Sequence, residues 1–219
     1  MPPRGLRYSR ESKEFDRAVA FIDATFALAL TLLVTTLDVD DAASTWRSWD
    51  SFSDALGDQL LAFAISFTVV AGYWFAHHRL LASFARIDAP TIAVNLVLVA
   101  AIVLLPFTTS SVGDPAVSDE PLPTVVLAIN VAAASLLHTV VYLVACHRGL
   151  LFTRPTSRER AGQVLIGVTP AIVFLATIPI AYLASPQAAW ASWLSLLVLR
   201  PLVRRGVQRW APEEEANPA

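Results

Sequence analysis

The sequence predicts an all-α integral membrane protein with six transmembrane helices per subunit. Hydrophobic residues make up 55% of the 219-residue chain and charged residues only 16%. The mean hydropathy is +0.56, whereas a soluble domain carries about 25% charged residues. This composition excludes a disordered chain, a nucleic-acid-binding protein and most classes of soluble enzyme.

Five apolar windows are long enough to cross a bilayer, and a sixth is shorter. A membrane helix needs about 20 mostly apolar residues, because a rise of about 1.5 Å per residue must cover about 30 Å. None of the windows alternates apolar and polar residues as a strand does. The expected spans are Ala18–Leu37, Leu56–Ala76, Thr91–Ser110, Val125–Ala145, Val164–Leu183 and Ala188–Val203.

The distribution of charge predicts how the chain inserts. Arg47 is the only one of the 16 basic residues that falls on the side opposite to the termini. The positive-inside rule therefore places both termini in the cytoplasm, and six spans agree with this. We expect residues 1–16 to form a cytoplasmic segment, 17–205 the transmembrane domain and 206–219 a disordered cytoplasmic tail. The loops on the outer side carry the acids Asp38, Asp40, Asp41, Asp50, Asp54, Asp58, Asp114, Asp119 and Glu120.

The motifs of common enzymes and metal sites are missing from the sequence. It contains no His-Glu-x-x-His, no P-loop, no Gly-x-Ser-x-Gly and no glycine fingerprint. His77 and His78 are adjacent, so they point to different faces of a helix and cannot hold one metal. The single cysteine, Cys146, excludes an internal disulfide and a cysteine-based zinc site. We therefore expect neither an enzyme nor a cofactor.

Asp23 is the only acid well inside an expected span. A charged side chain at the centre of a membrane helix costs about 2.5–3.5 kcal/mol, so Asp23 needs a partner. It is either an ion or proton ligand or a hydrogen-bonded acid that locks helices together. His138, near mid-membrane, is either a packing residue or a proton relay. Counting depth along neighbouring spans predicts one inner polar layer that contains Arg17, Asp23, Trp74, His77 and Asn95.

The first span also carries a stripe of alternating leucine and hydroxyl side chains. At about 100° per residue, the stripe comprises Leu28, Thr31, Leu32 and Thr35, and Asp23 lies about 140° from its centre. Several copies around a symmetry axis would form a dry leucine ring with threonine hydroxyls facing passing ions. The alternative is an ordinary packing seam, and periodicity alone favours the seam.

The first half of the chain resembles the transmembrane protein 175 family, which comprises lysosomal potassium channels and their bacterial homologues. The resemblance covers about residues 13–112. The family's usual serine before the aspartate is Ile22 here. The matching motifs are Arg17-x-x-x-Phe21-x-Asp23 with Thr31 eight residues later, then Trp74-Phe-Ala-His77, Asn95-Leu96 and Pro106-Phe107.

The resemblance implies a leak-type, potassium-permeable cation channel in the bacterial inner membrane. The single six-helix unit is similar to the bacterial members, which are homotetramers with the first helices lining a central pore. Leu28 matches their hydrophobic constriction, which replaces a carbonyl filter, and Thr31 the hydroxyl layer beyond it. The inner polar residues and Phe21 match a structural signature. The alternatives are a secondary transporter or proton pathway using Asp23 and the membrane histidines, and a non-conducting scaffold.

Overall fold

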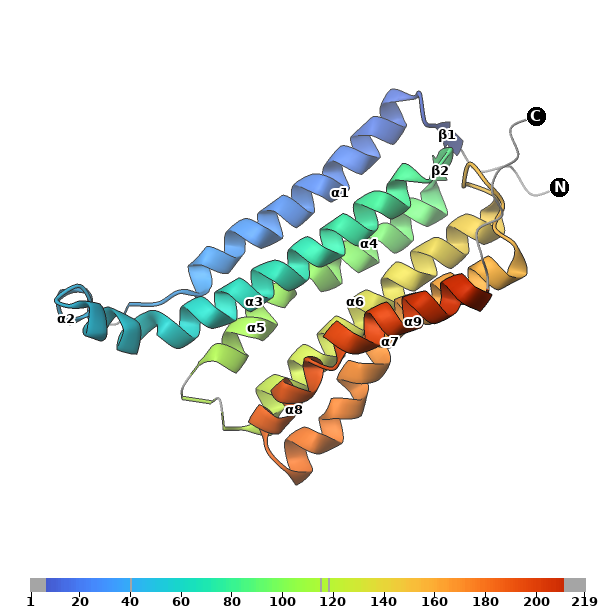
Figure 1. The fold of residues 1–219 in the computed structure, drawn as a ribbon. Helices are drawn as coiled ribbons and strands as arrows, with labels where there is room; N and C mark the ends of the chain where they lie inside the picture. The colour runs from blue at the N-terminus through green and yellow to red at the C-terminus, as the bar shows by residue number, and fades with distance from the viewer. Residues whose placement is uncertain (1–6, 40, 115, 118, 211–219) are drawn as a thin grey trace.

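The chain folds into long helices packed side by side (Figure 1). The computed structural model describes residues 7–39, 41–114, 116–117 and 119–210. Arg4, Asp40 and residues 211–219 lie outside these ranges. Residues 206–210, the start of the tail expected to be disordered, are helical.

Five segments are long and apolar enough to cross a membrane, and they correspond to the first five expected spans. Their length and composition describe a multi-pass membrane protein. The helices in these segments are α1 (Lys13–Leu32) with the 3-10 helix η1 (Leu33–Thr36), α3 (Trp49–Ala82), α4 (Ala89–Val103) with α5 (Leu105–Gly113), α6 (Pro121–Arg148) and α7 (Ser157–Leu183).

The second and third expected spans differ in detail from the observed helices. Helix α3 begins at Trp49, because Ser48 caps it by accepting a hydrogen bond from the Ser51 amide at 3.1 Å. A short helix, α2 (Ala42–Thr45), precedes it. The third span is divided at Leu104, between α4 and α5. Pro106 has no amide hydrogen to continue the helical bonding and is favoured only in the first turn of a new helix.

The sixth expected span is not one helix. It consists of α8 (Pro186–Trp193) and α9 (Leu196–Trp210), which run back beside α7 (Figure 1). The two helices are separated at Leu194 and Ser195. With 8 and 15 residues, each is too short to cross a membrane alone. Four arginines also make α9 more polar than the other spans: Arg200, Arg204, Arg205 and Arg209.

A small sheet, which the sequence pattern does not predict, joins the start of the chain to the loop after α3. Strand β1 (Arg7–Ser9) pairs antiparallel with β2 (Arg86–Asp88), with Tyr8 opposite Ile87. The Arg10 guanidinium donates hydrogen bonds to the carbonyl oxygens of Leu81 and Phe84 at 3.0 and 3.1 Å. Leu81 lies in the last turn of α3, where a helix leaves its acceptors unsatisfied, and Phe84 lies just beyond the helix.

Close helix packing places α6 at the centre of the bundle. Glycine allows α7 to approach it, because a Cβ at Gly167 would overlap the Thr139 side chain. A Cβ at Gly162 would overlap Val207 in the same way, between α7 and α9. Small residues at such crossings are typical of membrane helices, because they let backbones come close together.

Candidate functional site

Helix α1 has one buried face that packs into the bundle. Ser12 caps the helix by accepting a hydrogen bond from the Phe15 amide at 3.3 Å. The buried residues recur every three or four positions, which is the period of an amphipathic helix. They are Phe15, Ile22, Phe26 and Ala29.

The predicted stripe lies on the opposite face of α1 and is exposed in the single subunit. Leu28 is 54% exposed and Leu32 37%. The Thr31 hydroxyl donates to the Ala27 carbonyl oxygen at 2.6 Å, and the Thr35 hydroxyl to that of Leu32 at 2.7 Å. These bonds use the hydroxyl protons, so both oxygens keep a lone pair for an outside donor or cation.

The stripe is not one continuous α-helical row. The α-helix ends at Leu32, and Thr35 lies on η1, which has a smaller radius and a larger rise per residue. Leu28, Thr31 and Leu32 therefore form one α-helical surface, and Thr35 belongs to the tighter turn that follows it.

Asp23 finds its partner on α3. The indole Nε1 of Trp74 donates a hydrogen bond to Asp23 Oδ1 at 3.0 Å. The ring of His78 lies 5.4 Å from the Trp74 ring, centroid to centroid. Asp23 is half-buried and points away from the stripe, and its carboxylate connects α1 to α3.

The expected inner polar layer is divided into two parts. His77 is only 1% exposed and stacks on Phe26 at a centroid distance of 5.8 Å. Its other neighbour is His138, whose ring lies edge-on at 5.6 Å. Among the described residues, neither ring nitrogen of His77 has a hydrogen-bond partner. His138 is therefore a packing neighbour of His77, whereas depth counting placed it apart.

Arg17, Phe21 and Asn95 are not joined to Asp23. Asn95 is fully buried and donates to the Thr91 carbonyl oxygen of its own helix at 2.8 Å. Phe21 is 56% exposed, and its side chain shares the exposed face of α1 with Leu28. Arg17 is also exposed. These three side chains therefore lie apart from the Asp23–Trp74 pair within the subunit, because depth along a helix does not fix the direction in which a side chain points.

Asp88 is a buried acid that the sequence analysis missed. Its carboxylate accepts hydrogen bonds from the Thr91 amide at 3.2 Å and from the Arg148 Nε at 2.5 Å. Burial alone raises the pKa of Asp88, but the bonds from Thr91 and Arg148 outweigh it, so the pKa lies below 3.8. An aspartate just before Ala89-Pro90 is a helix-start pattern, and this signal identifies it as a cap of α4.

The described part of the chain contains no cluster of three or more His, Cys, Asp or Glu side chains that could hold a metal ion. The polar groups around α1 are instead hydroxyls, one carboxylate and aromatic ring nitrogens. Such groups suit a passage for small ions or the locking of helices.

Comparison with known proteins shows which family this segment resembles. Residues 17–106 match the sequence model of the family described as the endosomal/lysosomal potassium channel TMEM175. A potassium channel of Streptomyces collinus is 31% identical over 104 residues, which are 46% of this chain and 48% of the relative. A potassium channel of a Chryseobacterium species is 28% identical over 57% of this chain and 64% of the relative. The matches thus span about half to two thirds of these curated relatives.

Solved structures with the same fold also exist. The crystal structure of a lysosomal potassium-selective channel TMEM175 homolog from Chamaesiphon minutus superposes with a TM-score of 0.69 and 20% identity. It matches 90% of this chain and 99% of that one. A variant of the potassium channel MtTMEM175 gives a TM-score of 0.64 at 16% identity, over 95% of this chain and 99% of that one. At these identities the likeness concerns the fold. The resemblance to the TMEM175 family is therefore confirmed, and it is carried by residues 17–106 of this chain.

Proposed function

We propose that this protein is a potassium-permeable cation channel built from four identical subunits, with the α1 helices around a central pore. The single observation that carries the proposal is the exposed stripe on α1, within the segment that matches the family. The curated relatives are named potassium channels. In this proposal the chain is neither an enzyme nor a holder of a cofactor.

The stripe suits ion passage when several copies meet. One α1 helix cannot enclose a pore, and its leucines would face lipid or water. A ring of Leu28 side chains forms a narrow apolar constriction, which hinders any ion that keeps its hydration shell. Potassium sheds water more easily than sodium, so the ring favours potassium. The lone pairs of Thr31 then face a partly dehydrated ion beyond the ring.

The proposal includes a location and an orientation. The relatives are bacterial, so we place the protein in the inner membrane, with residues 17–205 as the channel domain. Together, α8 and α9 act as the sixth crossing, because they run antiparallel beside α7 (Figure 1). The arginines of α9 and of the other loops on that side put both termini in the cytoplasm.

A secondary transporter or proton pathway is the alternative, and one observation favours it. His77 and His138 lie together inside the bundle, and the ring nitrogens of His77 and the Nε2 of His138 lack partners among the described residues. Imidazole rings in such a position could bind and release protons. Asp23, the third group of this alternative, bonds Trp74 instead.

Flux through reconstituted protein distinguishes these functions. The full chain is placed in liposomes, and potassium and sodium fluxes are measured in imposed gradients, with and without a pH gradient. A channel gives a potassium flux that is not saturated at low ion concentration and does not require protons. Slower flux that moves protons with potassium identifies a transporter. Absence of any flux identifies a scaffold and contradicts the proposal.

A further inference from the structure

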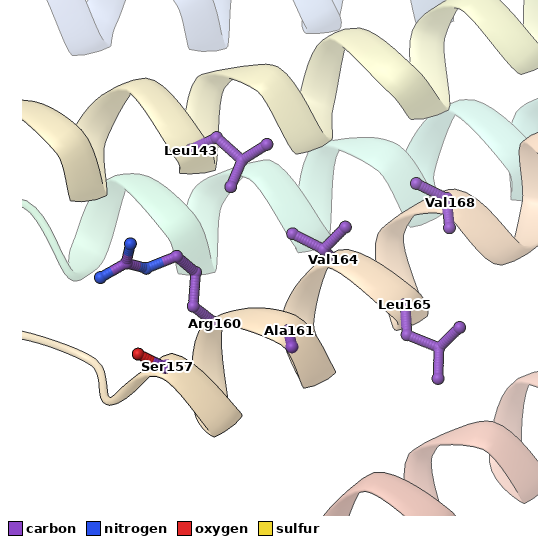
Figure 2. A pocket seen from close by; sticks show the side chains of 7 residues that line it. All are labelled: Leu143, Ser157, Arg160, Ala161, Val164, Leu165 and Val168. Carbon is purple, nitrogen blue, oxygen red and sulfur yellow. The ribbon is translucent and has the colours of Figure 1, made fainter.

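A groove runs between α6 and α7 on the surface of the bundle (Figure 2). It is an open groove with a volume of about 410 Å³. Its walls are apolar, with Leu143 from α6 and Val164 and Val168 from α7. Ser157 and Arg160 provide the polar groups, and both lie at the end where α7 begins.

The length of the groove matches one leaflet of a bilayer. Ser157 is the first residue of α7 and of the membrane-spanning segment. Val168 lies eleven residues further on, which is about 16 Å along a helix axis. Half of a hydrocarbon core of about 30 Å is about 15 Å. A lipid with its head group at the Ser157 end can therefore lay an acyl chain along Val164 and Val168 toward the middle of the membrane.

The polar end of the groove is positively charged. Within the described ranges, Arg160 forms no ion pair, although Glu159 is its neighbour. The Glu159 carboxylate instead accepts a hydrogen bond from the Thr156 amide at 2.6 Å, as part of the cap of α7. Arg148, the basic residue at the end of α6, pairs with Asp88. The Arg160 guanidinium is thus available for an anion.

The groove is remote from the stripe on α1. Helices α1 and α7 lie at opposite edges of the bundle (Figure 1). Assembly of subunits around α1 therefore leaves the groove between α6 and α7 at the periphery, where lipid surrounds the protein.

We propose that the groove binds an anionic phospholipid from the leaflet in which α7 begins. The lipid phosphate accepts hydrogen bonds from the Arg160 guanidinium and the Ser157 hydroxyl. One acyl chain lies along Val164 and Val168, against Leu143. Guanidinium groups pair with phosphate through two parallel hydrogen bonds, and basic pockets between membrane helices bind lipid head groups in this way.

Native mass spectrometry of the detergent-solubilised full chain tests the site. The protein is titrated with dioleoylphosphatidylglycerol and, separately, with dioleoylphosphatidylcholine. We expect the anionic lipid to bind about five- to tenfold more tightly, since one basic residue contributes about 1 kcal/mol to such binding. The Arg160→Gln variant is expected to lose this preference. Arg158→Gln, which removes an equal charge outside the groove, is expected to keep it.

A second variant separates the groove from general surface charge. Val164→Trp fills the apolar channel and is expected to weaken binding of both lipids while Arg160 remains. Helix content and melting temperature of each variant show whether it folds. Equal lipid binding by wild type and Arg160→Gln overturns the proposal, as does an equal loss in Arg158→Gln and Arg160→Gln. A change of oligomeric mass in Val164→Trp, with lipid binding unchanged, identifies the groove as a subunit contact and also overturns it.

Discussion

Helices α1 and α6 are both long and apolar, but they are covered to different degrees. In the most apolar stretch of α1 and η1, 22% of the residues are buried, against 56% in α6. Helix α6 lies inside the bundle, whereas α1 lies at its edge (Figure 1). The polar side chains of α6 also have more hydrogen-bond partners on other helices than those of α1. In α6, Ser135 bonds the Tyr73 hydroxyl at 2.5 Å, and Asn130 bonds Thr108 at 3.1 Å.

Within the described part of the chain, the hydroxyls on the stripe of α1 have no such partners from other helices. Those of Thr31 and Thr35 bond only to their own backbone and face outward. The polar side chains of α6 are thus paired within the subunit. By contrast, one face of α1, made of leucine and threonine, is exposed on the surface of the subunit. The proposed assembly around α1 requires such a difference, because the exposed face of α1 would then meet the other subunits.

The packing of α6 gives the largest expected effect on stability. Gly167→Ala places a methyl group against the Thr139 side chain, so we expect a loss of about 1–3 kcal/mol in the free energy of unfolding, as for other overpacked cores. Gly72→Ala is the matched control, because its added methyl group meets nothing within 4 Å. Thermal denaturation in detergent compares the two. Equal melting temperatures would mean that α6 and α7 are packed less closely than described.

Asp23 tests the contact between α1 and α3, the helix to which its hydrogen bond with Trp74 ties it. Asp23→Ala leaves the Trp74 indole N–H without its acceptor, and we expect a loss of about 1–2 kcal/mol, the cost of an unsatisfied polar group. Tetramer yield is expected to fall as well, with ion preference preserved. The control is Asp16→Ala, which removes an exposed acid from the first turn of α1. A well-folded Asp23→Ala protein with strongly changed selectivity would instead make Asp23 an ion ligand.

The smallest expected effect depends on pH and concerns the end of α6. The folded pKa of Asp88 is lowered from its ordinary value of 3.8. Its contribution to stability is therefore present above pH 3.8 and is lost as the pH falls through the lower, folded value. We expect Asp88→Asn to be less stable than wild type at pH 7, and the difference to shrink below pH 3.8. A stability difference that is independent of pH would contradict this.

The predictable part of the fold is the part that depends on long apolar runs. The first five spans follow from length and hydropathy, because the bilayer requires both in each helix. The face of α1 that carries Leu28 and Thr31 follows from helical period alone. Depth counting also placed Asp23 and Trp74 in the same inner layer, and the structure adds that they are bonded to each other.

The remaining features depend on contacts between distant segments. Strands β1 and β2 have three residues each, too few for a pattern of alternation. No proline or glycine next to Leu194 indicates that the sixth span is divided there. Asn95 shares the expected depth, but its amide turns to the backbone of its own helix. The direction in which a side chain points is set by packing against distant segments. It therefore cannot be predicted from a single sequence.

We propose that α1 lines an ion pathway, and the reversal potential tests this most directly. Leu28→Ala and Ile172→Ala each shorten one large aliphatic side chain on the surface of the subunit. Leu28 is 54% exposed and Ile172 is 59% exposed. Ile172 lies on α7, at the edge opposite α1 (Figure 1). Reconstituted wild type and both variants are measured in opposing potassium and sodium gradients.

Leu28→Ala widens and wets the apolar ring, so we expect larger currents and a reversal potential shifted toward zero, with the tetramer intact. Ile172→Ala is expected to keep the wild-type reversal potential. If Leu28→Ala retains wild-type selectivity while Ile172→Ala loses it, α1 does not line the pathway.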